Sequence, residues 1–166
     1  MKESIWSFLW GARFMLGIML IVGLVIILYH QVLMLLYGKD KFVEKDILKH
    51  NLCTTSLGFN YCSWWAISHF VFYAILGFLF PKYWVLLIII GILFEGFEYL
   101  WGRYYEGKSN VRFFNNKEID APYFFFNIRD IIANILGLTF GILLFKALYP
   151  QCNINNCNDT FCIFPK

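Results

Sequence analysis

Long apolar runs separated by polar segments form the dominant pattern of this chain. Crossing about 30 Å of hydrocarbon takes roughly 20 apolar residues in an α-helix. Runs of about that length predict transmembrane helices over residues 14–37, 64–80, 83–101 and 126–149. Pro81 and Pro150 follow the second and fourth runs. The helices should end there, because proline cannot continue a helix without losing a backbone hydrogen bond. The pattern predicts an all-α polytopic integral membrane protein of about four transmembrane helices: one helical domain over 1–149, then a Cys/Asn-rich polar tail over 150–166.

Composition supports a membrane environment and suggests how the helices are placed in it. Of the 166 residues, 60% are hydrophobic and 21% are aromatic, more than a soluble domain can bury. Only a few residues around Lys82 join the second and third runs, so these two helices must form an antiparallel hairpin. Amphipathic rings favour the membrane interface, and they lie near the predicted helix ends. These rings belong to Trp10, Trp64, Trp65, Trp84, Trp101 and Tyr149.

Charge bears on topology and on the class of partner. The net charge of +3 comes from 14 basic and 11 acidic residues, with no dense basic stripe, so no nucleic-acid partner is expected. The loop segments 38–63 and 102–123 hold eight Lys and Arg residues, against five at the opposite ends of the helices. This bias favours cytoplasmic loops and a lumenal or external tail. For a eukaryotic or viral protein, an endomembrane such as the endoplasmic reticulum is the expected location.

The cysteines leave two interpretations open. They occur at Cys53, Cys62, Cys152, Cys157 and Cys162. No pair has the close C-x-x-C spacing of a zinc site, and the histidines lie far away along the chain. The last two flank a glycosylation-type triplet, Asn158 to Thr160, which fits an oxidising compartment. Reduced free thiols and an unused triplet fit the sequence equally well.

Polar residues inside the third and fourth runs are the candidate chemistry. Glu95 and Glu98 are three residues apart and therefore share one helical face. Acidic residues cost on the order of 3 kcal/mol at the centre of a span, so they indicate function by default. The fourth run opens with Asp130, and Asn134 follows on the same stripe. His69 enters from the same side, about one turn into the second run, so all five residues should converge in one interfacial layer.

Glycines extend both polar stripes. Gly91 and Gly102 flank the glutamates, whereas Gly137 and Gly141 follow Asn134 on the stripe of the fourth run. Glycines on a stripe allow close approach of helix backbones. The third and fourth helices are therefore predicted to pack together along these faces.

Carboxylate and amide oxygens with no thiol nearby form a hard-ligand set. Such a set suits Ca²⁺, Mg²⁺ or Mn²⁺. At head-group depth, the cation would bind a lipid phosphate and make its phosphorus more electrophilic, while His69 acts as base or nucleophile. A purely structural alternative pairs Arg103 or Arg129 with Glu95 or Glu98 as an assembly device. His30 and Gln31 are expected to form interhelical contacts, and His50 to be a solvated loop residue.

Three sequence segments resemble the core of the eukaryotic base-exchange phosphatidylserine synthases. They are Ser68-His69-Phe70, then Phe94-Glu95-Gly96-Phe97-Glu98, and finally Asp130 with Asn134 and Gly137. The resemblance covers roughly residues 64–148. It implies calcium-dependent exchange of a phospholipid head group for L-serine, a phosphatidyl transfer. It also implies that Glu95, Glu98, Asp130 and Asn134 hold calcium and that His69 acts at the phosphorus.

Two other interpretations remain open. The Asp130 to Asn134 spacing, followed by Gly137 and Gly141, is also similar to the VanZ-like family of glycopeptide-resistance membrane proteins. A non-enzymatic membrane or envelope component would equally explain the small size and the aromatic richness. A transporter or channel fits less well, because the polar residues gather at one face of the bilayer instead of lining a path across it.

Overall fold

The structure, a computed structural model, describes residues 5–38, 41–49, 51–54, 60–105, 127–152 and 154. Within these ranges the chain is an all-α polytopic membrane protein with one small β-hairpin. Three helices are long and apolar enough to cross a membrane: Arg13–Tyr37, Pro81–Arg103 and Ile128–Leu148. A fourth apolar helix, α4 (Trp64–Leu79), has 16 residues. At 1.5 Å per residue α4 is about 24 Å long, shorter than the hydrocarbon thickness.

The helices begin and end close to the limits of the apolar runs. They are α1 (Ile5–Gly11), α2 (Arg13–Tyr37), α3 (Phe42–Lys45), α4, α5 (Trp84–Tyr105) and α6 (Ile128–Leu148). The Ser63 side chain caps α4 by accepting a hydrogen bond from the backbone N–H of Ala66 at 3.3 Å. Pro81 ends α4 and opens the 3-10 turn η2 (Pro81–Tyr83), which leads into α5. The predicted hairpin of the second and third helices is formed through this turn.

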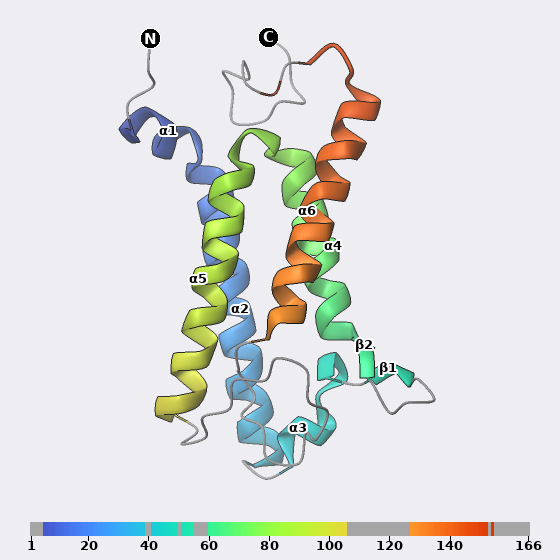
Figure 1. Cartoon of the computed structure of the whole chain (residues 1–166). Coiled ribbons are helices and arrows are strands. Elements are labelled where there is room, and N and C mark those ends of the chain that lie inside the picture. Colours follow the sequence, from blue (N-terminus) through green and yellow to red (C-terminus); the bar gives the residue numbers. More distant parts are fainter. Residues whose placement is uncertain are drawn as a thin grey trace.

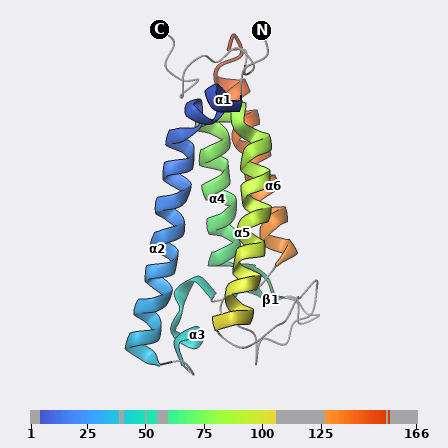
Figure 2. The same ribbon diagram turned by 90° about the vertical axis from the view of Figure 1, so that its left-hand side faces the viewer.

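The segment between α2 and α4 contains structure that the apolar pattern does not predict. After α3 come a short 3-10 helix, η1 (Ile47–Lys49), and strands β1 (Asn51–Thr54) and β2 (Asn60–Ser63). The strands pair antiparallel, with Cys53 opposite Cys62 in the backbone register. In Figures 1 and 2, α3, η1 and the hairpin lie at the end of the bundle opposite α1. We call this the loop end, and the opposite end the α1 end.

The closest helix packing joins α4 to α6, and not α5 to α6 as the glycine stripes predict. A Cβ atom added at Gly137 would collide with the carbonyl oxygen of Phe70, and one at Gly141 with that of Ala74. From the other side, a Cβ at Gly77 would lie 2.6 Å from the carbonyl oxygen of Leu138. These glycines serve close backbone approach as predicted, and they do so against α4, whereas the polar faces of α5 and α6 meet, as predicted, at Glu95 and Asp130.

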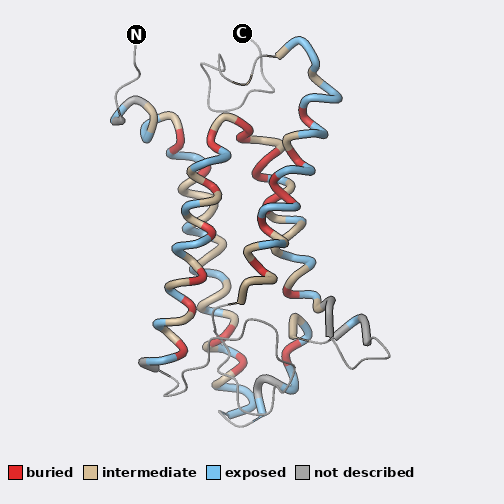
Figure 3. The backbone as a smooth tube through the Cα atoms, viewed as in Figure 1, coloured by how far each residue is buried: buried red, intermediate tan, exposed pale blue. Residues whose placement is uncertain are grey.

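Buried side chains at the α1 end of the bundle are apolar or aromatic. Those that form this core are Ala12, Met15, Tyr73, Leu76, Phe80, Tyr83, Leu87 and Leu138. They come from α2 and its lead-in, α4, η2, α5 and α6. Figure 3 shows buried positions on the inward sides of these helices, whereas large apolar residues lie on the outward sides. An apolar exterior is what a lipid environment requires.

Candidate functional site

Three potential ligands from three helices meet at the loop end of the bundle. His69 of α4, Glu95 of α5 and Asp130 of α6 each offer one atom, and these atoms lie within 4.8 Å of one another. Glu95 is 0% exposed and Asp130 is 3% exposed, while His69 is half-buried. The predicted convergence of these residues in one layer is therefore found in the structure.

Asn127, just before α6, connects the two carboxylates. Its side-chain oxygen caps the helix by accepting a hydrogen bond from the backbone N–H of Arg129 at 3.1 Å. Its side-chain amide donates to Oδ2 of Asp130 at 3.1 Å, and its backbone N–H donates to Oε2 of Glu95 at 3.1 Å. Asn127 thus holds α5 and α6 at the site. Sequence reasoning missed this residue, although an asparagine before a helix is a common N-cap.

The remaining carboxylate oxygens have no partner among the described residues. Buried atoms without a hydrogen bond are Oε1 of Glu95, Oε1 of Glu98 and Oδ1 of Asp130. Leaving a buried charged acceptor unsatisfied costs more than the roughly 1–3 kcal/mol typical of a neutral group. Three such atoms buried close together form a set of acceptors that a positively charged ligand would satisfy.

His69 is oriented by Asn134 from the next helix. Its Nδ1 lies 3.0 Å from Oδ1 of Asn134. Because an amide oxygen only accepts, Nδ1 carries the proton of this bond and Nε2 of the neutral ring keeps its lone pair. His69 can therefore act as a base or a ligand through Nε2. Asn134 contacts the cluster through this bond, and its role as a cation ligand stays a prediction.

Glu98 is buried beside the cluster but lies outside the group of three ligands. Its exposed fraction is 2%, and its charge interacts with those of Glu95 and Asp130. It lies one helical turn beyond Glu95 on α5. Glu98 is placed to add negative charge to the site, and its predicted role as a ligand stays a prediction.

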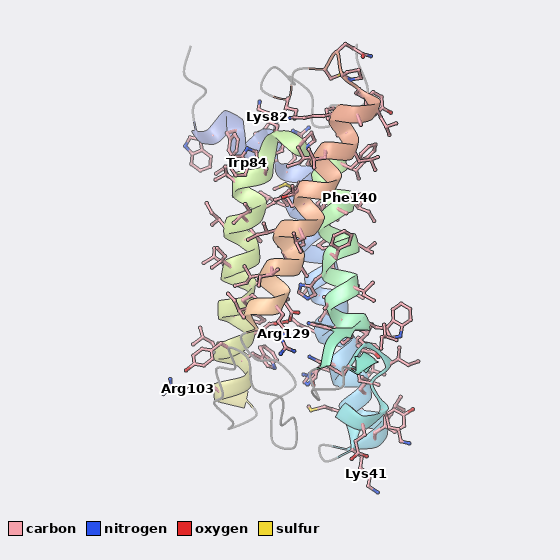
Figure 4. The ribbon with its side chains drawn as sticks, turned by 45° about the vertical axis from the view of Figure 1, so that its right-hand side comes forward. Lys41, Lys82, Trp84, Arg103, Arg129 and Phe140 are labelled. Carbon is pink, nitrogen blue, oxygen red and sulfur yellow. The ribbon has the colours of Figure 1, made fainter. Side chains whose placement is uncertain are left out.

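The structural alternative, in which arginines pair with the glutamates, can be followed for one of its two arginines. Arg103 is exposed and donates to the hydroxyl oxygen of Tyr99 at 3.4 Å. In Figure 4 it projects away from the bundle, whereas Arg129 lies at the start of α6. One oxygen of each glutamate, Oε1 of Glu95 and Oε1 of Glu98, has no hydrogen-bond partner among the described residues. Pairing of Arg129 with either glutamate stays a prediction.

An aromatic residue, Trp65, and a basic residue, Lys49, lie near the site but were not predicted to belong to it. Trp65 is 4% exposed, although its position near a helix end predicts an interfacial ring. Its side chain hydrogen-bonds Asp130, and its ring centroid lies 5.4 Å from that of His69. Nζ of Lys49, from η1, lies 4.5 Å from the Trp65 ring centroid. Sequence spacing carries no signal for such contacts between a loop and a helix.

A small cavity adjoins the site between α5 and α6. Its volume is about 10 Å³, room for about one water molecule. It is lined by Tyr73, Ile88, Gly91, Ile92, Ile131, Asn134 and Ile135. The cavity is too small for a phospholipid head group.

The other polar predictions have mixed outcomes. His30 is buried in α2, 1% exposed, and Gln31 is half-buried, and the interhelical contacts expected of them stay a prediction. His50 lies outside the described residues, as do Cys157 and Cys162 of the tail. Cys152 is a free thiol.

Known proteins do not assign the chain to a family. It matches no family model, no curated protein and no solved structure. The resemblances to base-exchange phosphatidylserine synthases and to VanZ-like proteins therefore stay predictions, and the functional argument rests on the geometry of the site.

Proposed function

We propose that this chain is a membrane-embedded enzyme that exchanges the head group of a phospholipid for L-serine with the help of a divalent cation. The observation that carries the proposal is a set of buried carboxylate oxygens beside His69, from Glu95, Glu98 and Asp130, that have no hydrogen-bond partner in the described part of the chain. Glu95 and Glu98 lie about two to three turns before the end of α5, whereas His69 and Asp130 lie within the first two turns of α4 and α6. That is the depth at which lipid phosphates meet the ends of transmembrane helices.

The donor set fits a hard divalent cation. Glu95 and Asp130 would hold it through the oxygens that Asn127 leaves free, with Glu98 completing the coordination, so that Nε2 of His69 keeps its lone pair for proton transfer. Oxygen ligands favour Ca²⁺, and Mg²⁺ or Mn²⁺ are alternatives. Such a cation supplies Lewis-acid polarisation of a phosphoryl oxygen.

In this proposal His69 moves the proton of the reaction. Nε2 takes the proton of the serine hydroxyl as the serine oxygen forms its bond to phosphorus. The bond between phosphorus and the oxygen of the old head-group alcohol breaks, and that oxygen receives the proton from His69. No oxidant or reductant is needed. Asn134 keeps the ring oriented through its bond to Nδ1.

Labelled serine tests the reaction directly. The purified chain in phosphatidylcholine or phosphatidylethanolamine micelles should incorporate labelled L-serine into lipid when calcium is present. Glu95→Gln should abolish incorporation, whereas Glu44→Gln, an exposed carboxylate of α3, should leave it unchanged. A folded, calcium-loaded wild-type protein that incorporates no serine would rule out this reaction. The endoplasmic reticulum is the membrane that we propose for it in a eukaryotic or virus-infected cell.

A further inference from the structure

Lys49 stands out as a basic residue built into the edge of the carboxylate cluster. Its Nζ lies 4.5 Å from the ring centroid of Trp65, whose side chain in turn hydrogen-bonds Asp130. The charge of Lys49 interacts with those of Glu95, Glu98 and Asp130. A lysine at this position is one aromatic ring away from the proposed cation site.

The position of Lys49 is supported by the elements around it. Its backbone N–H donates to the carbonyl oxygen of Asp46 at 3.1 Å. The Asp46 carboxylate, 0% exposed, accepts hydrogen bonds from the Tyr29 hydroxyl at 2.7 Å and from the backbone N–H of Leu48 at 2.9 Å. The short helix η1 also contacts α4. The Lys49 backbone is therefore linked to α2 through Asp46, which bonds Tyr29. Its side chain lies against Trp65 of α4.

The balance of charges at the site, counted with a bound cation and a phosphodiester, indicates a role for Lys49. When Glu95, Glu98 and Asp130 are all ionised around the cation, they carry one more negative charge than a divalent cation neutralises. A phosphodiester carries a further negative charge, and in surroundings of low dielectric constant this excess would repel it. Lys49 cancels the excess, so the phosphate would enter a site without net negative charge.

We propose that Lys49 is the phosphate-positioning residue of this site, binding the lipid head-group phosphate from the loop side while the carboxylates hold the cation. This inference rests on the proposed function for its substrate class. An ammonium group carries three donors for phosphate oxygens and is a common phosphate ligand. Because Arg103 bonds Tyr99 and points away from the bundle, Lys49 is the better placed of the two.

A competing role for Lys49 is to balance the carboxylates alone, and the two roles differ in measurable ways. In both cases Lys49→Gln removes a positive charge and should tighten calcium binding several-fold, which also reports a folded site. Only a phosphate-positioning role predicts weaker binding of a phospholipid. Lys49→Arg, which keeps the charge and the donors, should then retain most of that binding.

The test is equilibrium binding of a fluorescent short-chain phosphatidylcholine to the purified full chain in detergent with calcium. Lys49→Gln should weaken binding about tenfold, the effect of losing one charge-assisted hydrogen bond. Binding of a diacylglycerol with the same acyl chains should not change. Lys45→Gln, an exposed lysine of α3, should match the wild type.

Several outcomes would overturn the inference. These are wild-type affinity for phosphatidylcholine in Lys49→Gln, or an equal loss for diacylglycerol. Inorganic phosphate that binds as tightly as the lipid would assign the site to free phosphate instead of a head group. The proposed reaction can fail separately. If lipid binding depends on Lys49 but no serine is incorporated, the phosphate-binding role of Lys49 stands and the exchange reaction is ruled out.

Discussion

The two ends of the bundle are buried alike but differ in chemistry. At the α1 end, Met15, Phe80 and Leu87 are at most 1% exposed, and their neighbours are apolar side chains. At the loop end, Glu95 and Glu98 are at most 2% exposed, yet each keeps an oxygen that accepts no hydrogen bond from the residues that the structure describes. Apolar packing explains the burial at the α1 end. At the loop end, burying the carboxylates costs free energy that apolar packing does not offset. Where local consistency is broken in this way, a functional site is the expected cause.

The largest expected effect is a loss of stability from a substitution in the apolar core at the α1 end. Phe80→Ala should lower the free energy of unfolding by about 3–5 kcal/mol, because it empties a fully packed position. Phe140→Ala, at a position 53% exposed on the outer face, should cost far less. Thermal unfolding in detergent measures both. Calcium affinity should not change in the folded fraction of either variant, and a weakened site in Phe80→Ala would contradict the separation of the two ends.

A smaller effect is expected where α4 and α6 meet. Gly137→Ala places a methyl group against the carbonyl oxygen of Phe70, so the two helices must move apart at a cost of about 1–3 kcal/mol. Gly17→Ala on α2 meets nothing within 4 Å and should be neutral or stabilising. Chemical denaturation of both variants compares them. Equal stability of the two would show that the approach of α4 to α6 is less tight than the structure has it.

The smallest effect on stability concerns Asn127. Asn127→Ala removes the cap of α6 and should cost about 1 kcal/mol of stability. It also removes the donor to Asp130, and loss of such a supporting bond should lower calcium affinity about tenfold or more. Asn127→Ser keeps a capping oxygen, so it should recover stability without recovering affinity. Recovery of both together would mean that Asn127 acts only as a cap.

Sequence patterns predict the helices and much of the site. The apolar runs and Pro81 place α2, α4, α5 and α6 within a few residues, and agreement in depth brings His69, Glu95 and Asp130 together. Helical periodicity identifies which face of a helix is polar, but it does not identify the neighbour of that face. The glycines of α6 therefore pack on α4 instead of α5.

The loop contributions were beyond such patterns. Asn127, Asp46 and Lys49 reach the site or support it through contacts between segments far apart in the sequence. Trp65 lies near a helix end, where an interfacial ring is expected, but its side chain points inward and hydrogen-bonds Asp130. Periodicity and composition carry no information on these pairings, because the pairings depend on how the loop between α2 and α4 folds back.

Calcium binding by the purified chain tests the central claim most directly. Calorimetric titration should show saturable binding of one cation per chain, lost in both Glu95→Gln and Asp130→Asn and kept in Glu44→Gln, with circular dichroism unchanged in all three. A folded wild-type protein that binds neither Ca²⁺, Mg²⁺ nor Mn²⁺ would contradict the account. So would Glu95→Gln and Asp130→Asn variants that bind the cation as tightly as the wild type does.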